Sequence, residues 1–174
     1  MSVTISKLTS RRQQREQTRD VILRAAIETF AQAGFEAASL AEIAKQAGVK
    51  KALVQYHFAT KEELWQQSAS QLWQQRNDYM AQFIRGSDAA AGDIAQKMGQ
   101  GFTALIKFTR ENPQWLWFMF HEAAVDGDRL QWLVENCLEN DYLLGESFVK
   151  EFQQQGLIRK GSPQHLLHLI SGAL

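Results

Sequence analysis

Apolar residues recur along the chain at the three- and four-residue spacing of amphipathic helices. The first apolar stripe consists of Ile22, Leu23, Ala26, Ile27 and Phe30. It predicts a helix over about residues 19–33, and Gly34 then provides a residue that can end a helix with positive φ. Phe35 is placed to pack back on Phe30, so this helix is expected to be scaffold for the segments that follow.

Two shorter segments follow, each with the signals of a capped helix. Ser39 has Glu42 three residues later, which is a capping-box pattern, and Gly48 fits a helix C-terminus. A second short helix is predicted over residues 50–58. A short helix, a glycine turn and a second helix form a helix-turn-helix, here residues 39–58.

The second short helix has one apolar side, formed by Val54 and Phe58, and an opposite side suited to DNA. The opposite side carries Lys50, Lys51, Leu53, Gln55, Tyr56 and His57. Glutamine can pair with an adenine edge, lysine with guanine or phosphate, and leucine with a thymine methyl. This composition predicts a DNA-reading face; the alternative is a helical hairpin that only packs and has a basic rim by chance.

Another capping-box pattern, Thr60 with Glu63, begins a series of long helices. Lys61 and the free amides at this helix start are expected to seat a phosphate. Long helices are predicted over residues 61–85, 89–111, 114–124, 128–155 and 163–174. The segment 115–120, Trp-Leu-Trp-Phe-Met-Phe, is apolar on all sides and should be central to its domain. No convincing strand-like alternation occurs, so the fold class predicted is all-α.

Charge is distributed unevenly between the two ends of the chain. The 174 residues have a formal net charge of zero, with 45% apolar and 22% charged residues, as in ordinary soluble domains. Residues 1–61 hold ten Lys or Arg against five Asp or Glu, a net charge of +5, and the remaining residues balance it. This asymmetry fits one DNA-facing end.

The N-terminal segment is basic as well as polar. Residues 1–15 are expected to form a disordered arm, and Arg11, Arg12, Arg15 and Arg19 either touch DNA phosphates or a minor groove or belong to a solvated tail. The segment lacks the apolar core of a signal peptide. The longest apolar run, residues 115–120, is too short to span a bilayer, so no membrane association is expected.

Cys137 is the only cysteine, so no intrachain disulfide can form and a reducing cytoplasm is the expected setting. It is either a redox sensor or, more commonly for such a position, a small core residue. An enzyme is not expected: residues 145–149 imitate a nucleophile elbow but lack its final glycine. No cofactor is expected. His121, Glu122, Asp126 and Asp128 could be metal ligands, but neighbouring His121 and Glu122 point to different helix faces and no His-Glu-x-x-His pattern occurs, so a cap or an ion pair is expected there instead of a metal.

Residues 19–64 resemble the DNA-binding domain of the TetR (tetracycline-repressor) family of bacterial transcription regulators. The resemblance is carried by Ile22, Ala25, Ala26, Phe30, Gly34, Phe35, Leu40, Ile43, Ala44, residues 47–49, residues 52–58 and residues 61–64. The chain departs from the family at Lys50, Ala52 and Gln55, where the family often has Ser or Thr, Gly, and an aromatic residue or His. Because these positions face bases or phosphates, the departures bear on the operator sequence rather than on the fold.

The resemblance implies an N-terminal three-helix helix-turn-helix DNA-binding domain, residues 16–62, followed by a helical ligand-binding and dimerisation domain, residues 63–174. The expected DNA-binding residues are Ser39, Lys50, Lys51, Ala52, Leu53, Gln55, Tyr56, His57 and Lys61. Family members usually dimerise through their last two long helices, of which only the beginning of the first is expected here. Either the second domain is truncated at its C-terminus or the dimer uses other contacts. A homodimer is still expected, because half-site reading needs two recognition helices one DNA turn apart.

The resemblance also implies a small-molecule site among the helices that follow the DNA-binding domain. The candidate lining residues are Trp65, Trp73, Phe102, Trp117, Phe120, His121 and Tyr142. Such residues suit a small apolar or aromatic effector, although an aromatic stripe at helical spacing is more often plain core. The function implied is a repressor that an effector releases from a palindromic double-stranded operator; the alternative is a helical protein-interaction module without specific DNA binding.

Overall fold

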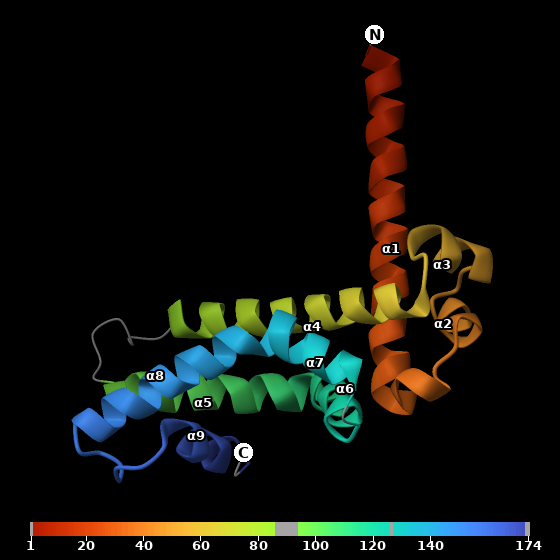
Figure 1. Cartoon of the computed structure of the whole chain (residues 1–174). Coiled ribbons are helices and arrows are strands. Elements are labelled where there is room, and N and C mark those ends of the chain that lie inside the picture. The colour runs from red at the N-terminus through yellow and green to blue at the C-terminus, as the bar shows by residue number, and fades with distance from the viewer. Residues whose placement is uncertain (1, 86–93, 126, 173–174) are drawn as a thin grey trace. The chain divides into compact units, whose positions relative to one another are not determined.

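The computed structural model describes residues 2–85, 94–125 and 127–172, and within these ranges the chain is helical with no strand (Figure 1). The elements are α1 (Ser2–Ala37), α2 (Leu40–Gln46), α3 (Lys51–His57), α4 (Lys61–Arg85), α5 (Ile94–Glu111), α6 (Pro113–Ala123), α7 (Asp128–Leu133), the π-helical turn η2 (Val134–Leu138), α8 (Glu139–Gln154) and α9 (Pro163–Gly172). The all-α prediction is confirmed. No described helix has the length and apolar character that crossing a membrane requires.

The chain divides into two compact units, and each is described by itself. The first comprises Met1–Leu72 and Gln114–Val125, and the second comprises Trp73–Pro113 and Asp126–Leu174. The predicted boundary at residues 62–63 differs from this division, because the first turns of α4 and most of α6 belong to the first unit. The reason lies in aromatic packing that joins these helices to α1, described below.

Helix α1 is longer than predicted. It begins at Ser2, so the expected disorder of residues 1–15 does not hold for the described residues 2–15. No glycine or proline precedes Gly34, and residues 11–17 are all Arg, Gln or Glu, which are strong helix formers. Arg12 and Glu16 add an i,i+4 pair, with Nε and Oε1 3.0 Å apart. The backbone leaves the helix at Gly34 (φ 73°), as predicted, and the Phe35 ring stacks on Phe30 at 6.0 Å.

The helix-turn-helix forms as predicted. The Ser39 hydroxyl caps α2 by accepting a hydrogen bond from the Glu42 amide (3.1 Å). Gly48 adopts a φ of 66°, and the Val49 amide then donates to the Ala44 carbonyl at 2.9 Å, which closes the helix end. Val54 on α3 is fully buried.

The start of α4 also carries its predicted cap. The Glu63 amide donates to the Thr60 hydroxyl (2.9 Å), and the Glu63 carboxylate accepts from the Ala59 amide (2.8 Å). Both interactions fix the direction in which the chain leaves α3 and enters α4.

Aromatic rings form the centre of the first unit. Phe118 of α6 stacks on Trp65 of α4 with ring centroids 5.5 Å apart, and its edge meets Phe30 of α1 at 6.2 Å. All three are almost fully buried. Since edge-to-face and offset stacked pairs add to the free energy of burial, α6 is part of the core that supports the helix-turn-helix.

The second unit departs from prediction in one long helix. Residues 128–155 were expected to be continuous, but they form α7, the π-helical turn η2 and α8. No glycine or proline marks this insertion in the sequence. Gly156 ends α8 with a φ of 72°, as predicted, and the Leu157 amide donates to the Phe152 carbonyl at 3.0 Å. The break predicted at residues 86–88 lies outside the described residues.

Candidate nucleic-acid interface

The outward face of α3 gathers the predicted base-reading residues. Lys51, Ala52, Leu53, Gln55 and Tyr56 are all exposed, and Lys50 is exposed at the N-cap. Tyr56 leaves 66% of its surface in solvent although its ring is large and partly apolar. Since the opposite side of this helix is anchored by buried Val54, the donors and acceptors of α3 are held outward on a rigid support.

His57 is half-buried at the end of α3. Burial lowers the pKa of its imidazole below 6.5, and the positive charges of Arg15 and Arg19 lower it further. The ring is therefore neutral at pH 7 and offers one donor and one acceptor rather than a charge. The sequence alone predicted this residue as a DNA contact but not its charge state.

Two arginines of α1 lie against the recognition helix and its C-cap. The guanidinium carbon of Arg15 lies 5.6 Å from the centre of the Tyr56 ring, and that of Arg19 lies 5.4 Å from the centre of the Phe58 ring. Arg19 also donates to the Gln67 side chain of α4. The spacing of Arg15 and Arg19 could have predicted these contacts, because both arginines continue the apolar stripe of α1 toward the N-terminus.

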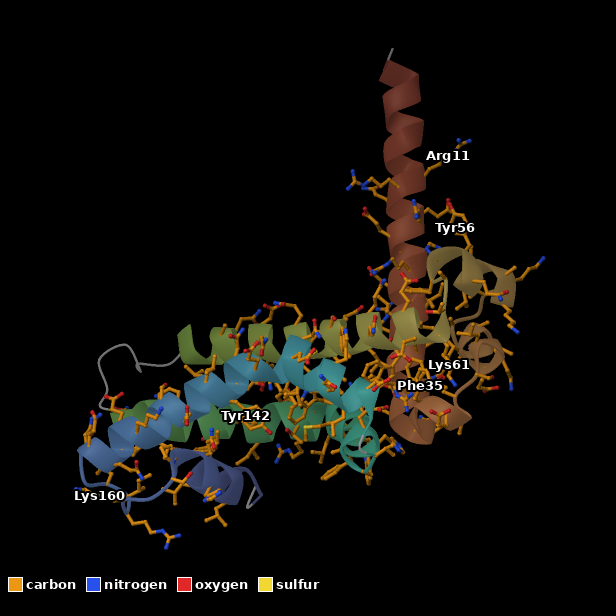
Figure 2. All side chains as sticks on the ribbon, in the orientation of Figure 1. Arg11, Phe35, Tyr56, Lys61, Tyr142 and Lys160 are labelled. Atoms are coloured by element: carbon orange, nitrogen blue, oxygen red, sulfur yellow. The ribbon has the colours of Figure 1, made fainter. Side chains whose placement is uncertain are left out.

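Ser39 and Lys61 are partly engaged inside the protein. The Ser39 oxygen accepts the Glu42 amide, which leaves its hydroxyl hydrogen to donate outward. Lys61 donates to the Glu36 carbonyl (3.3 Å), and its ammonium lies 4.4 Å from the centre of the Phe35 ring (Figure 2). A phosphate at this helix start would share Lys61 with these partners.

The predicted ligand-binding residues fall into both units. Trp65, Trp117, Phe120 and His121 lie in the first, and Trp73, Phe102 and Tyr142 lie in the second. Trp65 and Trp73 are almost fully buried, as core residues are, and a ligand contact at either of them stays a prediction. Trp117 and Phe120 remain 58% and 52% exposed with ring centroids 6.3 Å apart, and Tyr142 is exposed as well.

Metal ligands and a serine nucleophile are two other kinds of site that the described part of the chain could hold. No three His, Cys, Asp or Glu side chains gather there in a way that could hold a metal ion. The stretch that imitates a nucleophile elbow, residues 145–149, lies inside α8, where the strained strand-to-helix turn of that motif cannot form.

Comparison with known proteins places the helix-turn-helix among regulators. Residues 22–67 match the family described as bacterial regulatory proteins, tetR family. Over 76 residues the chain is 37% identical to the HTH-type transcriptional regulator AcrR of Shigella flexneri, a match that covers 41% of this chain and 35% of that protein. The matched region therefore spans about a third of the length of that relative.

Two solved structures share the fold over most of the chain. HlyIIR, a hemolysin II transcriptional regulator, has a TM-score of 0.71 at 24% identity, covering 90% of this chain and 84% of that one. FadR of Bacillus subtilis, in complex with stearoyl-CoA, has a TM-score of 0.69 at 20% identity, covering 87% and 80%. Residues 22–67 therefore form a DNA-binding domain of the kind described for the bacterial regulatory proteins of the tetR family, within an all-α fold shared with these two structures.

Proposed function

We propose that this protein is a sequence-specific transcription regulator, a repressor that a small effector releases from a palindromic operator in the bacterial cytoplasm. The observation that carries the proposal is the outward face of α3, where Lys51, Gln55 and Tyr56 stand exposed on a helix anchored by buried Val54. A face used only for packing would not hold such side chains in solvent.

The α3 side chains have distinct roles in this proposal. Gln55 pairs with an adenine edge, and Leu53 and Ala52 contact thymine methyl groups. Lys50 and Lys51 contact phosphate or guanine, while Ser39, Tyr56 and neutral His57 donate to the backbone. Lys61 contacts a phosphate at the start of α4.

The short length of the recognition helix α3 supports a homodimer. Helix α3 comprises only the seven residues Lys51–His57, enough to read one half-site. Two copies related by a two-fold axis read two half-sites about one DNA turn apart, which makes the operator palindromic. The second unit would supply the dimer contacts.

The effector is proposed to be small and apolar or aromatic. The FadR structure named above holds stearoyl-CoA, which shows an acyl ligand on this fold. In this chain the candidate contacts are those of the predicted ligand-binding residues that are not fully buried: Phe102, Trp117, Phe120, His121 and Tyr142. The effector can release DNA only to the extent that it binds the DNA-free conformation more tightly.

Selection of bound duplexes from random DNA at low and moderate salt tests the proposal. We expect a two-fold symmetric site from the unmodified protein, loss of that site from Lys51→Ala, a changed base preference from Gln55→Ala, and uniformly weaker binding from Lys61→Ala. Lys160→Ala, an exposed lysine of the second unit (Figure 2), is the control and should change neither property. If no sequence is enriched at either salt, the chain is a helical interaction module instead.

A further inference from the structure

Four arginines share one face of the N-terminal half of α1. At 3.6 residues per turn, positions 11, 12, 15 and 19 lie within about 100° of one another around the helix axis. The same face continues into the buried Ile22 and Ala26. The part of α1 that extends beyond the core therefore carries an arginine face (Arg11, Arg12, Arg15 and Arg19) in register with the side that packs on the helix-turn-helix.

The inner two arginines show where this face points. Arg19 lies over the ring of Phe58, the C-cap of α3, and Arg15 lies over the ring of Tyr56, in the last turn of α3. Arg11 is one helical turn farther out, and Figure 2 shows it projecting from α1 on the side where Tyr56 lies. The arginine face thus continues the exposed face of α3 past its C-terminal end.

The charge of this face is only weakly compensated. Arg12 pairs with Glu16, but both side chains are largely exposed, at 82% and 60%, so the pair adds little free energy. Arg15 stacked on Tyr56 keeps its in-plane N–H groups available, because a guanidinium that lies over a ring donates from its edges. Asp20 lies on the opposite side of the helix by its position in the turn.

We propose that Arg11, Arg12 and Arg15 bind the phosphates of duplex DNA that flanks the half-site read by α3. This inference rests on the proposed function and adds a second contact surface to it. Guanidinium groups bind phosphate oxygens through paired N–H donors. Since contacts to phosphates fix position without reading sequence, this surface sets affinity and the register of α3 in the groove. Because α1 is helical here, the arginines are held in place before DNA arrives.

The test measures the salt dependence of binding to the selected operator duplex. Each phosphate contact contributes about 0.9 to the slope of log affinity against log salt concentration. Because the proposed homodimer carries each arginine twice, each substitution removes two phosphate contacts. We therefore expect Arg11→Gln to reduce the loss of affinity between about 50 and 200 mM salt by about 12-fold, and Arg11→Gln with Arg12→Gln by about 150-fold. Base preference should stay unchanged in both variants.

Arg24→Gln is the matched control, because Arg24 is an exposed arginine on the other side of the same helix. Glutamine keeps helix propensity close to that of arginine, and circular dichroism of each variant verifies that α1 is retained. If the protein selects an operator but the Arg11 and Arg12 variants keep the slope of the Arg24 control, the inference is overturned and the proposed function stands. If the unmodified protein selects no operator, both fail.

Discussion

The imidazole of His121 donates a hydrogen bond from Nε2 to the backbone carbonyl of Ala31, at 3.0 Å. A carbonyl oxygen can only accept, so Nε2 carries a hydrogen. The other ring nitrogen, Nδ1, faces Gly34, where a Cβ would lie only 3.1 Å from it. Helix α6 is thereby fastened to the last turn of α1, within the unit that carries the helix-turn-helix.

This contact predicts that Gly34→Ala destabilises the protein for two reasons. Alanine at a φ of 73° and a ψ of 171°, a backbone region essentially restricted to glycine, costs about 1–3 kcal/mol, and its methyl group would push the His121 ring away from Ala31. Gly48→Ala is the matched control: its φ is 66°, but a Cβ there meets nothing within 4 Å. Urea denaturation should show a larger loss of stability for Gly34→Ala than for Gly48→Ala. Equal losses would show that the His121 contact contributes nothing.

A second prediction concerns the titration of His57. Burial and the charges of Arg15 and Arg19 lower its pKa, so NMR should place it below the ordinary value of 6.5. Arg15→Gln removes one of these charges and should raise the pKa of His57, while burial still keeps it depressed. Arg24→Gln should leave the titration unchanged.

The same shift has a consequence for stability. Because the folded pKa is below the unfolded one, the unfolded chain binds more protons once the pH falls below about 6.5. Stability from this residue is therefore present above that pH and lost as the pH falls through the folded pKa. In the His57→Gln variant, the free energy of unfolding should fall less between pH 7.5 and pH 5.5 than it does in the unmodified protein. An equal fall in both proteins would contradict the assignment.

Cys137 is predicted to be a poor nucleophile. Burial is the main cause that raises the pKa of its thiol to about 11, with Asp141 raising it further and Arg76 acting in the opposite direction. At pH 8 only about one thiol in a thousand is then ionised, and the thiolate is the reactive form. Alkylation by iodoacetamide should be more than about tenfold slower in the folded protein than in urea. A comparable rate in both states would favour a redox role.

Local sequence signals were sufficient to predict the helix ends and caps of the DNA-binding part. Gly34, Ser39, Gly48 and Thr60 each act through their own backbone or a neighbour three or four residues away, so each cap could be placed before the fold was known. Packing between distant segments was not readable in this way. Apolar spacing marks Phe118 as buried but does not say that its partners are Trp65 and Phe30.

The ligand-binding residues show the same limit. Periodicity placed Trp65 and Trp73 on an amphipathic helix, and the apolar run 115–120 placed Trp117 in a central helix, yet Trp65 and Trp73 are buried and Trp117 is exposed. Which side of a helix is covered depends on neighbours that the sequence does not name. The helical state of residues 2–15 was not predicted for another reason: a polar segment without an apolar stripe predicts neither burial nor order, and only its residues 11–15 have high helix propensity.

A last prediction concerns the second unit, where the Arg76 guanidinium binds the Asp141 carboxylate through two contacts of 2.6 and 2.7 Å. Arg76 is buried and Asp141 is partly exposed, so the pair joins α4 to α8 at the edge of that unit's core. Asp141→Asn removes the negative charge beside a buried cation and should lower the free energy of unfolding by about 2 kcal/mol. Glu139→Gln, which removes an exposed acid from the same first turn of α8, controls for the helix N-terminal charge. If both variants lose the same stability, the helix dipole rather than the pair with Arg76 accounts for the effect.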